Sequence, residues 1–323
     1  MARLDRGPVS GAACGPDMPA IEARSLSFAY PGADAAVLEG LDWSVPQGAF
    51  ALLVGGTGSG KSTLLSLLKP EIAPAGERTG DARVLGENVA DMDVRASAER
   101  VGYVFQDPEN QIVCKTVWHE MAFGLENLGM SRDEMRRRVA ETSYFFGLED
   151  WLHRDTDTLS GGRKQLLSLA AVLALRPRVL LLDEPTSQLD PVAEKNFLHA
   201  LFRVNRELGC TVVVATHQPR PMLEYATCAY RIEGGRVREV SDLASLGSRE
   251  GLLALDSCRP AQGAATSAAA AIREGWFRYD RASGWVLRGL DVTFSVGAVH
   301  AVVGGNGCGK STMLSVLAKT AKL

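Results

Sequence analysis

The sequence lacks several features that would assign it to a common class. No apolar run approaches the ~20 residues that cross a bilayer, and the N-terminus has neither the apolar core nor the cleavage pattern of a secretory signal. The six cysteines are scattered, without a CxxC pair or Cys/His cluster, which favours reduced thiols. Basic residues are not in excess, because 35 Lys and Arg face 38 Asp and Glu. We therefore expect no nucleic-acid partner, and a membrane role would need a second, membrane-spanning chain.

The length of 323 residues predicts about two domains. Residues 1–19 are rich in Gly, Pro and Ala and are expected to form a flexible tail. Residues 20–245 alternate strand-like and helical patterns, which predicts an α/β domain with a largely parallel sheet. Residues 246–268 are expected to form a linker, and residues 269–323 the start of a second domain. Strands are predicted over 50–56, 101–105, 179–185 and 211–216, and a helix over 163–175.

An internal repeat supports this division. Phe28 aligns with Phe277, and the alignment runs without a gap to Leu68 and Leu317 with about half of the positions identical. Such identity indicates a duplicated domain. The second copy is expected to hold an aromatic residue, Tyr279, a glycine-rich loop and the flanking strands, and to stop soon after that loop.

The repeated loop fits the pattern G-x-x-x-x-G-K-[ST] between a buried strand and an apolar helix, which is the context of a phosphate-binding loop. Its backbone N–H groups would cradle a polyphosphate, Lys61 would reach the β- and γ-phosphates, and the Ser62 hydroxyl would bind Mg²⁺. A glycine-serine linker is the alternative, but a linker would not lie between a strand and a helix. The first cradle comprises Gly55, Gly56, Thr57, Gly58, Ser59, Gly60, Lys61, Ser62 and Thr63. The second comprises Gly304, Gly305, Asn306, Gly307, Cys308, Gly309, Lys310, Ser311 and Thr312.

The segment "LLLDEP" reads as a buried parallel strand that ends in two carboxylates. Ligands bind at the carboxyl ends of strands in open α/β sheets, so Asp183 is placed to hold Mg²⁺ through water. Glu184 is placed to act as general base on an attacking water. Taken alone, the pair could equally be a solvated strand end.

The segment "LSGGRKQ" predicts a second anion-binding helix terminus. Ser160 is a good N-cap residue, and Gly161 and Gly162 expose backbone N–H groups at the start of an apolar helix. Arg163 and Lys164 lie in the first turn, where the helix dipole disfavours cations. Either solvent screens these two charges, or a polyphosphate from elsewhere docks on them.

The order of these motifs resembles that of ATP-binding cassette (ABC) ATPases. The resemblance implies a P-loop NTPase fold with a RecA-like core, an antiparallel β subdomain and a helical subdomain, followed by a partial second copy. It also implies that Tyr30 stacks on adenine, that Gln106 contacts Mg²⁺ and senses a membrane partner, that Asp190 in "SQLD" belongs to the loop that communicates across a dimer, and that His217 contacts the γ-phosphate. The implied catalytic residues are Glu184, His217 and Gln106, and the implied Mg²⁺ ligands are Ser62, Gln106 and Asp183. Gln188 and Arg163 depart from the usual motif residues and are expected to tune hydrolysis rather than abolish it.

In that family ATP lies between the phosphate loop of one cassette and the LSGG of another. The implied cofactors are ATP and Mg²⁺, and the implied partner is a second ABC ATPase domain, supplied by a homodimer or by the remainder of the second cassette. The segment "VFQDPENQI" resembles that of energy-coupling factor (ECF) and cobalt-type importers. This resemblance implies a transmembrane coupling protein, a substrate-binding membrane subunit, a vitamin or metal ion as cargo, and a location on the cytoplasmic face of the cell membrane.

Three other classes of protein share some of these motifs. Soluble tandem cassettes that act on ribosomes usually join their domains by a long charged arm, whereas the region between the copies is short and Ala-rich. Structural-maintenance ATPases place a long coiled coil before LSGG, and no sustained heptads occur here. A non-catalytic regulatory role is disfavoured by Glu184 and His217 in the first domain, while the second gives no evidence of competence.

Overall fold

The computed structural model describes residues 18–247, 267–279, 284–305 and 307–320. The chain divides into two units, Met1–Ser248 and Arg249–Leu323. Nearly all of the tail expected at residues 1–19 and most of the linker expected at 246–268 lie outside the described residues.

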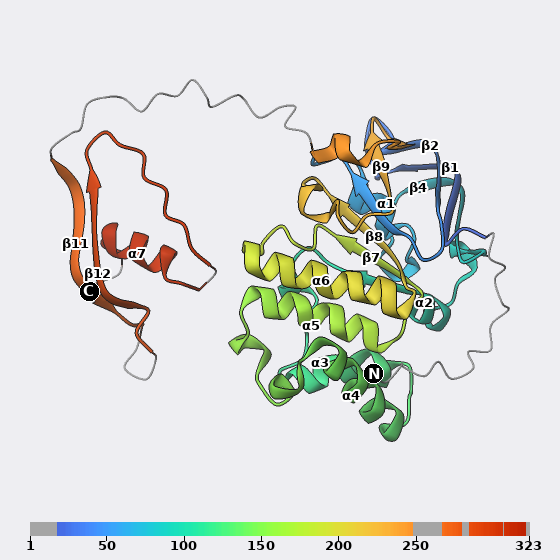
Figure 1. Ribbon diagram of the computed structural model, residues 1–323. Coiled ribbons are helices and arrows are strands. Elements are labelled where there is room, and N and C mark those ends of the chain that lie inside the picture. The colour runs from blue at the N-terminus through green and yellow to red at the C-terminus, as the bar shows by residue number, and fades with distance from the viewer. Residues whose placement is uncertain (1–17, 248–266, 280–283, 306, 321–323) are drawn as a thin grey trace. The chain divides into compact units, whose positions relative to one another are not determined.

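A six-stranded sheet forms the centre of the first unit (Figure 1). Its order is β10-β9-β3-β8-β7-β6, and all neighbours are parallel except β10 and β9. The bounds are β3 Phe50–Val54, β6 Val101–Val104, β7 Val179–Asp183, β8 Thr211–Thr216, β9 Cys228–Glu233 and β10 Arg236–Glu239. Every residue of β3, β7 and β8 is buried, as expected for parallel strands that are covered on both faces. The predicted α/β class is confirmed.

A smaller antiparallel sheet has the order β2-β1-β4-β5. Its strands are β1 Ile21–Ala29, β2 Leu38–Val45, β4 Glu77–Val84 and β5 Glu87–Asn88. A bulge in β1 places Ser25 at a positive φ of 48°, and the Ser25 N–H donates to Asp42 Oδ1 at 2.8 Å. This hydrogen bond satisfies an amide that the bulge removes from the strand ladder.

Six α-helices complete the described part of this unit: α1 Lys61–Ser66, α2 Val94–Arg100, α3 Val117–Asn127, α4 Arg132–Phe146, α5 Gly161–Ala174 and α6 Pro191–Leu208. Short 3₁₀ turns occur at Pro70–Ile72, Val89–Asp91, Pro108–Asn110, Glu149–Trp151, Thr156–Thr158, Arg220–Met222 and Leu243–Gly247. Side-chain caps begin several helices, as at Ser131 for α4, and Gly147 ends α4 in the left-handed conformation.

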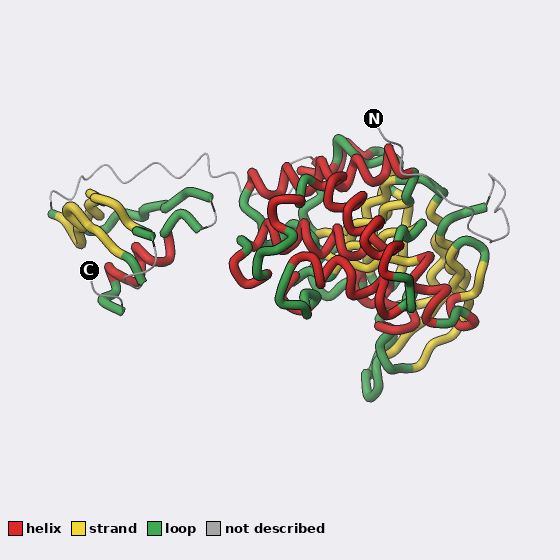
Figure 2. Tube along the Cα trace, turned by 90° about the horizontal axis from the view of Figure 1, so that it is seen from below, coloured by secondary structure: helices red, strands yellow, loops and turns green. Residues whose placement is uncertain are grey.

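The alternation of side chains along β3 divides the core of this unit into two layers. Ala51 and Leu53 face α1 and the antiparallel sheet, whereas Phe50 and Leu52 face α5 and α6. A third cluster joins α3, α4 and the outer face of α5. Figure 2 shows most of the helices of this unit gathered on one side and much of its strand structure on the other.

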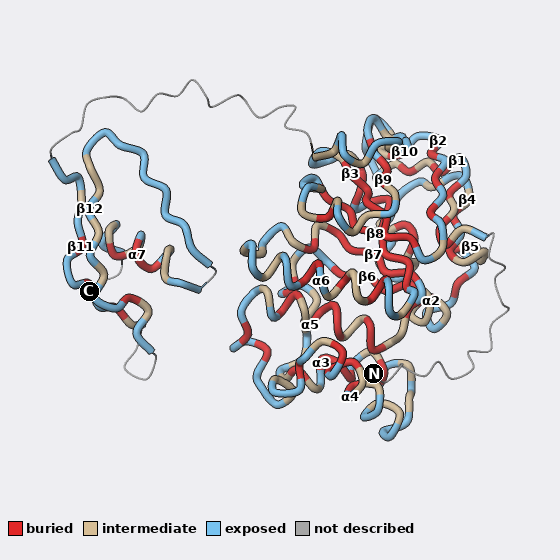
Figure 3. The backbone as a smooth tube through the Cα atoms, in the orientation of Figure 1, coloured by how far each residue is buried: buried red, intermediate tan, exposed pale blue. Residues whose placement is uncertain are grey.

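The second unit consists of a hairpin, β11 Ala268–Phe277 and β12 Leu287–Ser295, and a helix, α7 Lys310–Leu317. Its small core contains Phe277, Leu287 and Met313. The strand expected before the second glycine loop does not form, and Val299 and Val303 are exposed (Figure 3). The reason is physical: its counterpart β3 is held between β8 and β9, which come from later in the chain, and the described part of this unit contains no such strands.

None of the described helices is both long enough and apolar enough to span a membrane.

Candidate active site

The phosphate loop follows β3 and ends at Gly60, whose φ of 97° starts α1. A side chain at Gly55 would lie 2.7 Å from the Ile232 carbonyl oxygen, so the loop passes too close to β9 for any residue but glycine. Lys61 is buried, and its Nζ donates to the carbonyls of Gly55 at 2.8 Å and Gly56 at 3.0 Å. The lysine thus lies folded back over the loop that it is expected to serve.

The tip of the loop is open. Gly56, Thr57 and Gly58 are exposed, and Gly58 has a positive φ of 78°. The Ser59 hydroxyl is buried and has no hydrogen-bond partner. A buried hydroxyl without a partner is costly, and a ligand oxygen in the cradle would satisfy it.

Three predicted residues meet at the carboxyl ends of β7 and β8. Because these strands are parallel neighbours, Glu184 and His217 follow at the same edge of the sheet. The Glu184 Oε1 lies 2.9 Å from His217 Nδ1 and 3.5 Å from Lys61 Nζ. Glu184 has a positive φ of 44°, and its N–H donates to the Ala215 carbonyl at 2.9 Å. The structure therefore holds this carboxylate in a strained backbone position between a lysine and a histidine.

Asp183 ends β7 beside this cluster. Burial raises the pKa of its carboxyl and the Glu184 charge adds to the rise, while the Ser62 hydroxyl, Lys61 and the Tyr103 hydroxyl oppose it. Burial likewise raises the pKa of Tyr103. The Asp183 Oδ1 is buried without a hydrogen-bond partner. A buried carboxylate oxygen facing a serine hydroxyl is a donor set that fits Mg²⁺.

Tyr30 is partly exposed, and its hydroxyl forms a 2.9 Å hydrogen bond with Thr63 Oγ1 on α1. Its ring lies nearly perpendicular to that of Phe28, with the ring centres 5.0 Å apart. The hydroxyl end of the Tyr30 side chain is therefore fixed to α1, the helix that follows the phosphate loop.

Gln106 is exposed in the loop after β6, and its Nε2 lies 3.4 Å from Ser187 Oγ. The Ser187 hydroxyl donates to the Glu184 carbonyl at 3.0 Å. Gln106 thus approaches the loop that follows Glu184, and it makes no hydrogen bond to Asp183 or Ser62 among the described residues. Asp190, at the end of the same loop, caps α6 by accepting from the N–H groups of Val192 and Ala193.

The glycines at the start of α5 have different surroundings. A side chain at Gly162 would lie 2.7 Å from the Ala193 Cβ on α6, whereas Gly161 faces open space. Ser160 occupies the N-cap position but makes no capping hydrogen bond with its side chain, contrary to the expectation. Among the described residues, no hydrogen bond or ion pair joins Ser160, Gly161 or Gly162 to the phosphate loop.

The two cations of this turn have different surroundings: Arg163 is exposed, so solvent can screen its charge, whereas Lys164 is not solvated. The Arg163 guanidinium stacks over the Trp151 ring at 4.5 Å. Lys164 is buried, and its Nζ lies 2.5 Å from Glu109 Oε1. Both charges find partners within the unit, because the helix packs against the turns before and after it.

The second glycine loop has the shape of the first. Lys310 Nζ donates to the carbonyls of Gly304 and Gly305 at 2.7 Å each, and Gly309 has a φ of 95°. Asn306 lies outside the described residues. Gly307, Ser311 and the thiol of Cys308 are exposed, and the Tyr279 hydroxyl forms a 2.9 Å hydrogen bond with Thr312. No strand end with carboxylates accompanies this loop in the described part of the unit.

These motifs coincide with a known family. The family model described as ABC transporter matches residues 38–187 and again residues 287–322. The chain belongs to the ABC transporter ATP-binding family. Its first unit is an ABC ATPase domain, and both matched segments contain a phosphate loop.

Curated relatives support this assignment. A Bacillus cereus protein that carries the name ABC transporter ATP-binding protein is 40% identical over 341 residues, covering 92% of this chain and 61% of the relative. A Methanosarcina acetivorans protein with the same name is 37% identical over 220 residues, covering 68% of this chain and 67% of the relative. The chain thus spans only 61% of the length of the first of these relatives.

Two solved structures share the fold of the ABC ATPase domain. The structure of cbiO1 from Clostridium perfringens, part of the ABC transporter complex cbiONQ, is 30% identical with a TM-score of 0.62 and covers 69% of this chain and 88% of that one. The ATP-binding cassette MJ0796, in a dimeric post-hydrolysis state bound to ADP and Pi, is 26% identical with a TM-score of 0.60 and covers 68% and 97%.

Several residues that shape the ABC ATPase site were not singled out from the sequence. A hydrogen bond from the Tyr103 hydroxyl lowers the pKa of Asp183 and so offsets part of the rise caused by burial. Gln218 Nε2 lies 3.2 Å from His217 Nε2. Glu109 and Lys164 pair across 55 positions of sequence. Gln218 could have been noticed because it directly follows His217 in the sequence. No local sequence pattern predicts a contact between residues as far apart as Glu109 and Lys164.

Proposed function

We propose that the first unit binds ATP with Mg²⁺ and hydrolyses it. The observation that carries this proposal is the contact of Glu184 with both Lys61 and His217, at 3.5 and 2.9 Å, beside an open phosphate loop. This arrangement supports roles for Glu184 as base, Lys61 as phosphate-binding cation and His217 as orienting imidazole.

In this proposal each residue has a distinct task. Lys61 exchanges its loop carbonyls for the β- and γ-phosphates, and the amides of residues 55–60 donate to the phosphate oxygens. Glu184 accepts the proton of the attacking water, and His217 holds that carboxylate and faces the γ-phosphate. Ser62, Asp183 and Gln106 would hold Mg²⁺, which when bound neutralises charge on the phosphates. Tyr30 stacks on the adenine ring.

The Glu184→Gln variant tests this assignment. Because an amide cannot take a proton from water, turnover should fall by about 10³-fold while ATP binding persists. Steady-state ATPase rates and binding of a fluorescent ATP analogue measure the two properties. Glu99→Gln, a change at an exposed glutamate of α2, is the matched control. Near-normal turnover in Glu184→Gln would place the base elsewhere.

We also propose that the site is completed by a second ABC ATPase domain. Two observations support this idea. Among the described residues, Ser160, Gly161 and Gly162 make no hydrogen bond to the phosphate loop of their own unit, and the family model matches a second time at residues 287–322. The second domain comes from another copy of this chain or from the remainder of the second cassette in a tandem protein. Sedimentation of the Glu184→Gln variant with and without ATP measures whether two ABC ATPase domains associate. If ATP changed neither the mass nor the compactness of the protein, the proposal would be contradicted.

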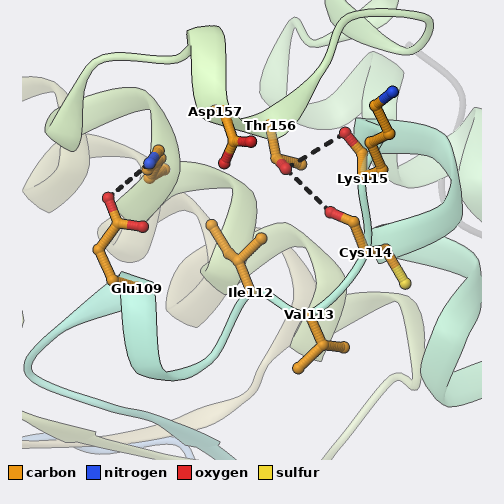
Figure 4. Close-up of a pocket in the computed structure, with 8 residues that line it drawn as sticks. Glu109, Ile112, Val113, Cys114, Lys115, Thr156 and Asp157 are labelled. Atoms are coloured by element: carbon orange, nitrogen blue, oxygen red, sulfur yellow. Dashed lines mark hydrogen bonds and ion pairs between the residues drawn. The ribbon is translucent and has the colours of Figure 1, made fainter.

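The domain is proposed to energise an importer of the ECF or cobalt type from the cytoplasmic face of the membrane. Support comes from "VFQDPENQI" and from the likeness to cbiO1, which is part of cbiONQ. The implied partners are a transmembrane coupling protein and a substrate-binding membrane subunit, with a vitamin or metal ion as cargo. The proposed docking face includes a pocket beside this segment, lined in part by Ile112, Val113 and Cys114 (Figure 4).

A pair of valines tests this docking. Val113, at the pocket, is 65% exposed, and Val94, on α2, is 68% exposed. Val113→Asp should reduce co-purification with a coexpressed coupling protein by about tenfold, because a buried charge at an interface costs well over 1 kcal/mol. Val94→Asp should leave co-purification unchanged. Equal yields for the two variants would exclude this face, and retention on ribosomal particles instead would support a soluble cassette.

A further inference from the structure

Lys164 carries a positive charge at a position that disfavours one. It lies in the first turn of α5 and is only 8% exposed. A cation at a helix N-terminus opposes the helix dipole, and burial adds a desolvation cost. The described structure gives its Nζ one side-chain partner, the Glu109 carboxylate at 2.5 Å. Glu109 therefore offsets a charge that would otherwise destabilise the turn carrying Ser160 to Gly162.

A second contact ties the same turn to the same loop. Gln165, also buried, donates from its Nε2 to the Phe105 carbonyl at 3.3 Å. The Phe105 N–H in turn donates to Gln111 Oε1 at 3.0 Å. The loop that carries Gln106 is therefore held to α5 at its start, through Gln165, and at its middle, through Lys164.

The other side of the turn is fixed by packing. The Gly162 backbone lies so close to Ala193 of α6 that a side chain would clash at 2.7 Å. The turn at residues 160–162, which we call the signature turn, is thus held between α6 and the Gln106 loop. Glu109 is an exposed residue, so its side chain can rotate away and open the ion pair without moving α5.

The pair also lines a pocket. Glu109 and Lys164 face a cavity of about 210 Å³ together with Asp157 and Thr156 (Figure 4). Its wall is rigid, since the Thr156 hydroxyl donates to the Cys114 carbonyl at 2.9 Å and Glu120 accepts from the N–H groups of Val113 and Cys114. A group that enters this cavity meets the ion pair directly.

We propose that Lys164 is a positioning residue for the signature turn. Its ion pair with Glu109 keeps residues 160–162 and the Gln106 loop together as one unit, so that opening the pair loosens the turn that completes the nucleotide site. The effect on turnover rests on the proposed ATPase function, whereas the effect on the turn itself does not.

Charge exchange tests the pair. Glu109→Gln, Glu109→Lys and Lys164→Glu each break it, and the double variant Glu109→Lys with Lys164→Glu restores it in reverse. Hydrogen exchange of the Lys164 amide, which donates to the Ser160 carbonyl at 2.9 Å, reports the turn without nucleotide. Breaking the pair should speed this exchange about tenfold, as expected for a hydrogen bond to a charged group worth about 1.5 kcal/mol, and the double variant should return it toward wild type.

Turnover should follow the same order. The kcat for ATP should fall about tenfold in the single variants with little change in KM, because Lys61 and the first loop are untouched, and it should recover in the reversed pair. Glu99→Lys, which breaks the exposed Arg95–Glu99 pair, is the control and should change neither measurement.

The outcomes separate cleanly. A double variant no better than the poorer single variant, in exchange or in turnover, would overturn the positioning role, as would unchanged exchange in Glu109→Gln, a mild change at an exposed side chain that should not prevent folding. If the wild-type chain showed no ATPase activity at all, the proposed function would fail while the exchange measurement would still decide the role of Lys164.

Discussion

The two glycine-rich loops of this chain fold alike but have different neighbours. In both, a lysine donates to two loop carbonyls at 2.7–3.0 Å, and a tyrosine hydroxyl meets a threonine at 2.9 Å. Around the first loop lie Asp183, Glu184 and His217. Around the second, the described residues supply no strand end, and Val299 and Val303 are exposed.

This difference in neighbours shows that the shape of the loop and the composition of the site around it have separate origins. Loop shape follows from local sequence, because glycines at fixed positions adopt positive φ and a helix begins at the lysine. Asp183, Glu184 and His217 lie at the ends of β7 and β8, more than a hundred residues later, and β8 also pairs with β3. A phosphate loop without these side chains keeps its phosphate-binding shape but has no neighbouring carboxylate or imidazole.

Replacing the lysine of each loop should give the largest difference between the two loops. Lys61→Ala should weaken ATP binding by about 10²-fold, since it removes charge-assisted hydrogen bonds worth ~1.5–3 kcal/mol. Lys310→Ala should leave the affinity and turnover of the first site within about twofold, because its loop has no partner groups in the described unit. Titration with a fluorescent nucleotide and ATPase rates compare them. Equal losses from the two changes would mean that both loops serve one site.

The next largest effect is expected within the first unit, at the two adjacent glycines of the signature turn. Gly162→Ala should lower the free energy of unfolding by ~1–3 kcal/mol, because the added methyl group overlaps Ala193. Gly161→Ala meets open space and should change it by less than about 0.5 kcal/mol. Urea unfolding followed by tryptophan fluorescence distinguishes them, and a stable Gly162→Ala would show that α5 and α6 can separate without cost.

Asp183 lies at a strand end that has no counterpart in the described part of the second unit. Because burial raises its pKa, the folded state favours the protonated carboxyl, so stability is lost as pH rises from the ordinary value of 3.8 through the higher folded value. Asp183→Asn should remove this loss and raise the free energy of unfolding near pH 7 by about 1 kcal/mol, while abolishing any stabilisation by Mg²⁺ with nucleotide. Melting temperatures with and without Mg²⁺ measure both effects. A lower melting temperature without ligand would contradict the desolvation argument.

The smallest difference is expected where the loops are most alike. Tyr30→Phe and Tyr279→Phe each remove a hydrogen bond of 2.9 Å to a threonine of the following helix. Each change should cost about 0.5–1 kcal/mol of local stability. Hydrogen exchange in α1 and α7 measures them separately. A much larger loss in α7 would show that the second unit depends on this bond more than the first does.

Local patterns in the sequence predicted much of this architecture. The strand expected at 211–216 is β8, and the helix expected from residue 163 begins two residues earlier, at Gly161. Ser160 fits the N-cap pattern, but its side chain does not cap, and Lys164 is buried against Glu109 rather than solvated. The repeat also wrongly implied a strand before the second loop. These differences share one cause, since each depends on contacts with distant segments that a local pattern does not contain.

The backbone of Glu184 has a consequence for how such a domain changes over time. At a φ of 44° an L-residue other than glycine carries about 1 kcal/mol or more of strain. Glycine or asparagine would relieve it and would also remove the carboxylate. Selection for stability alone would therefore favour glycine or asparagine at this position over glutamate. A glutamate here marks a position where the fold gives up stability for a carboxylate.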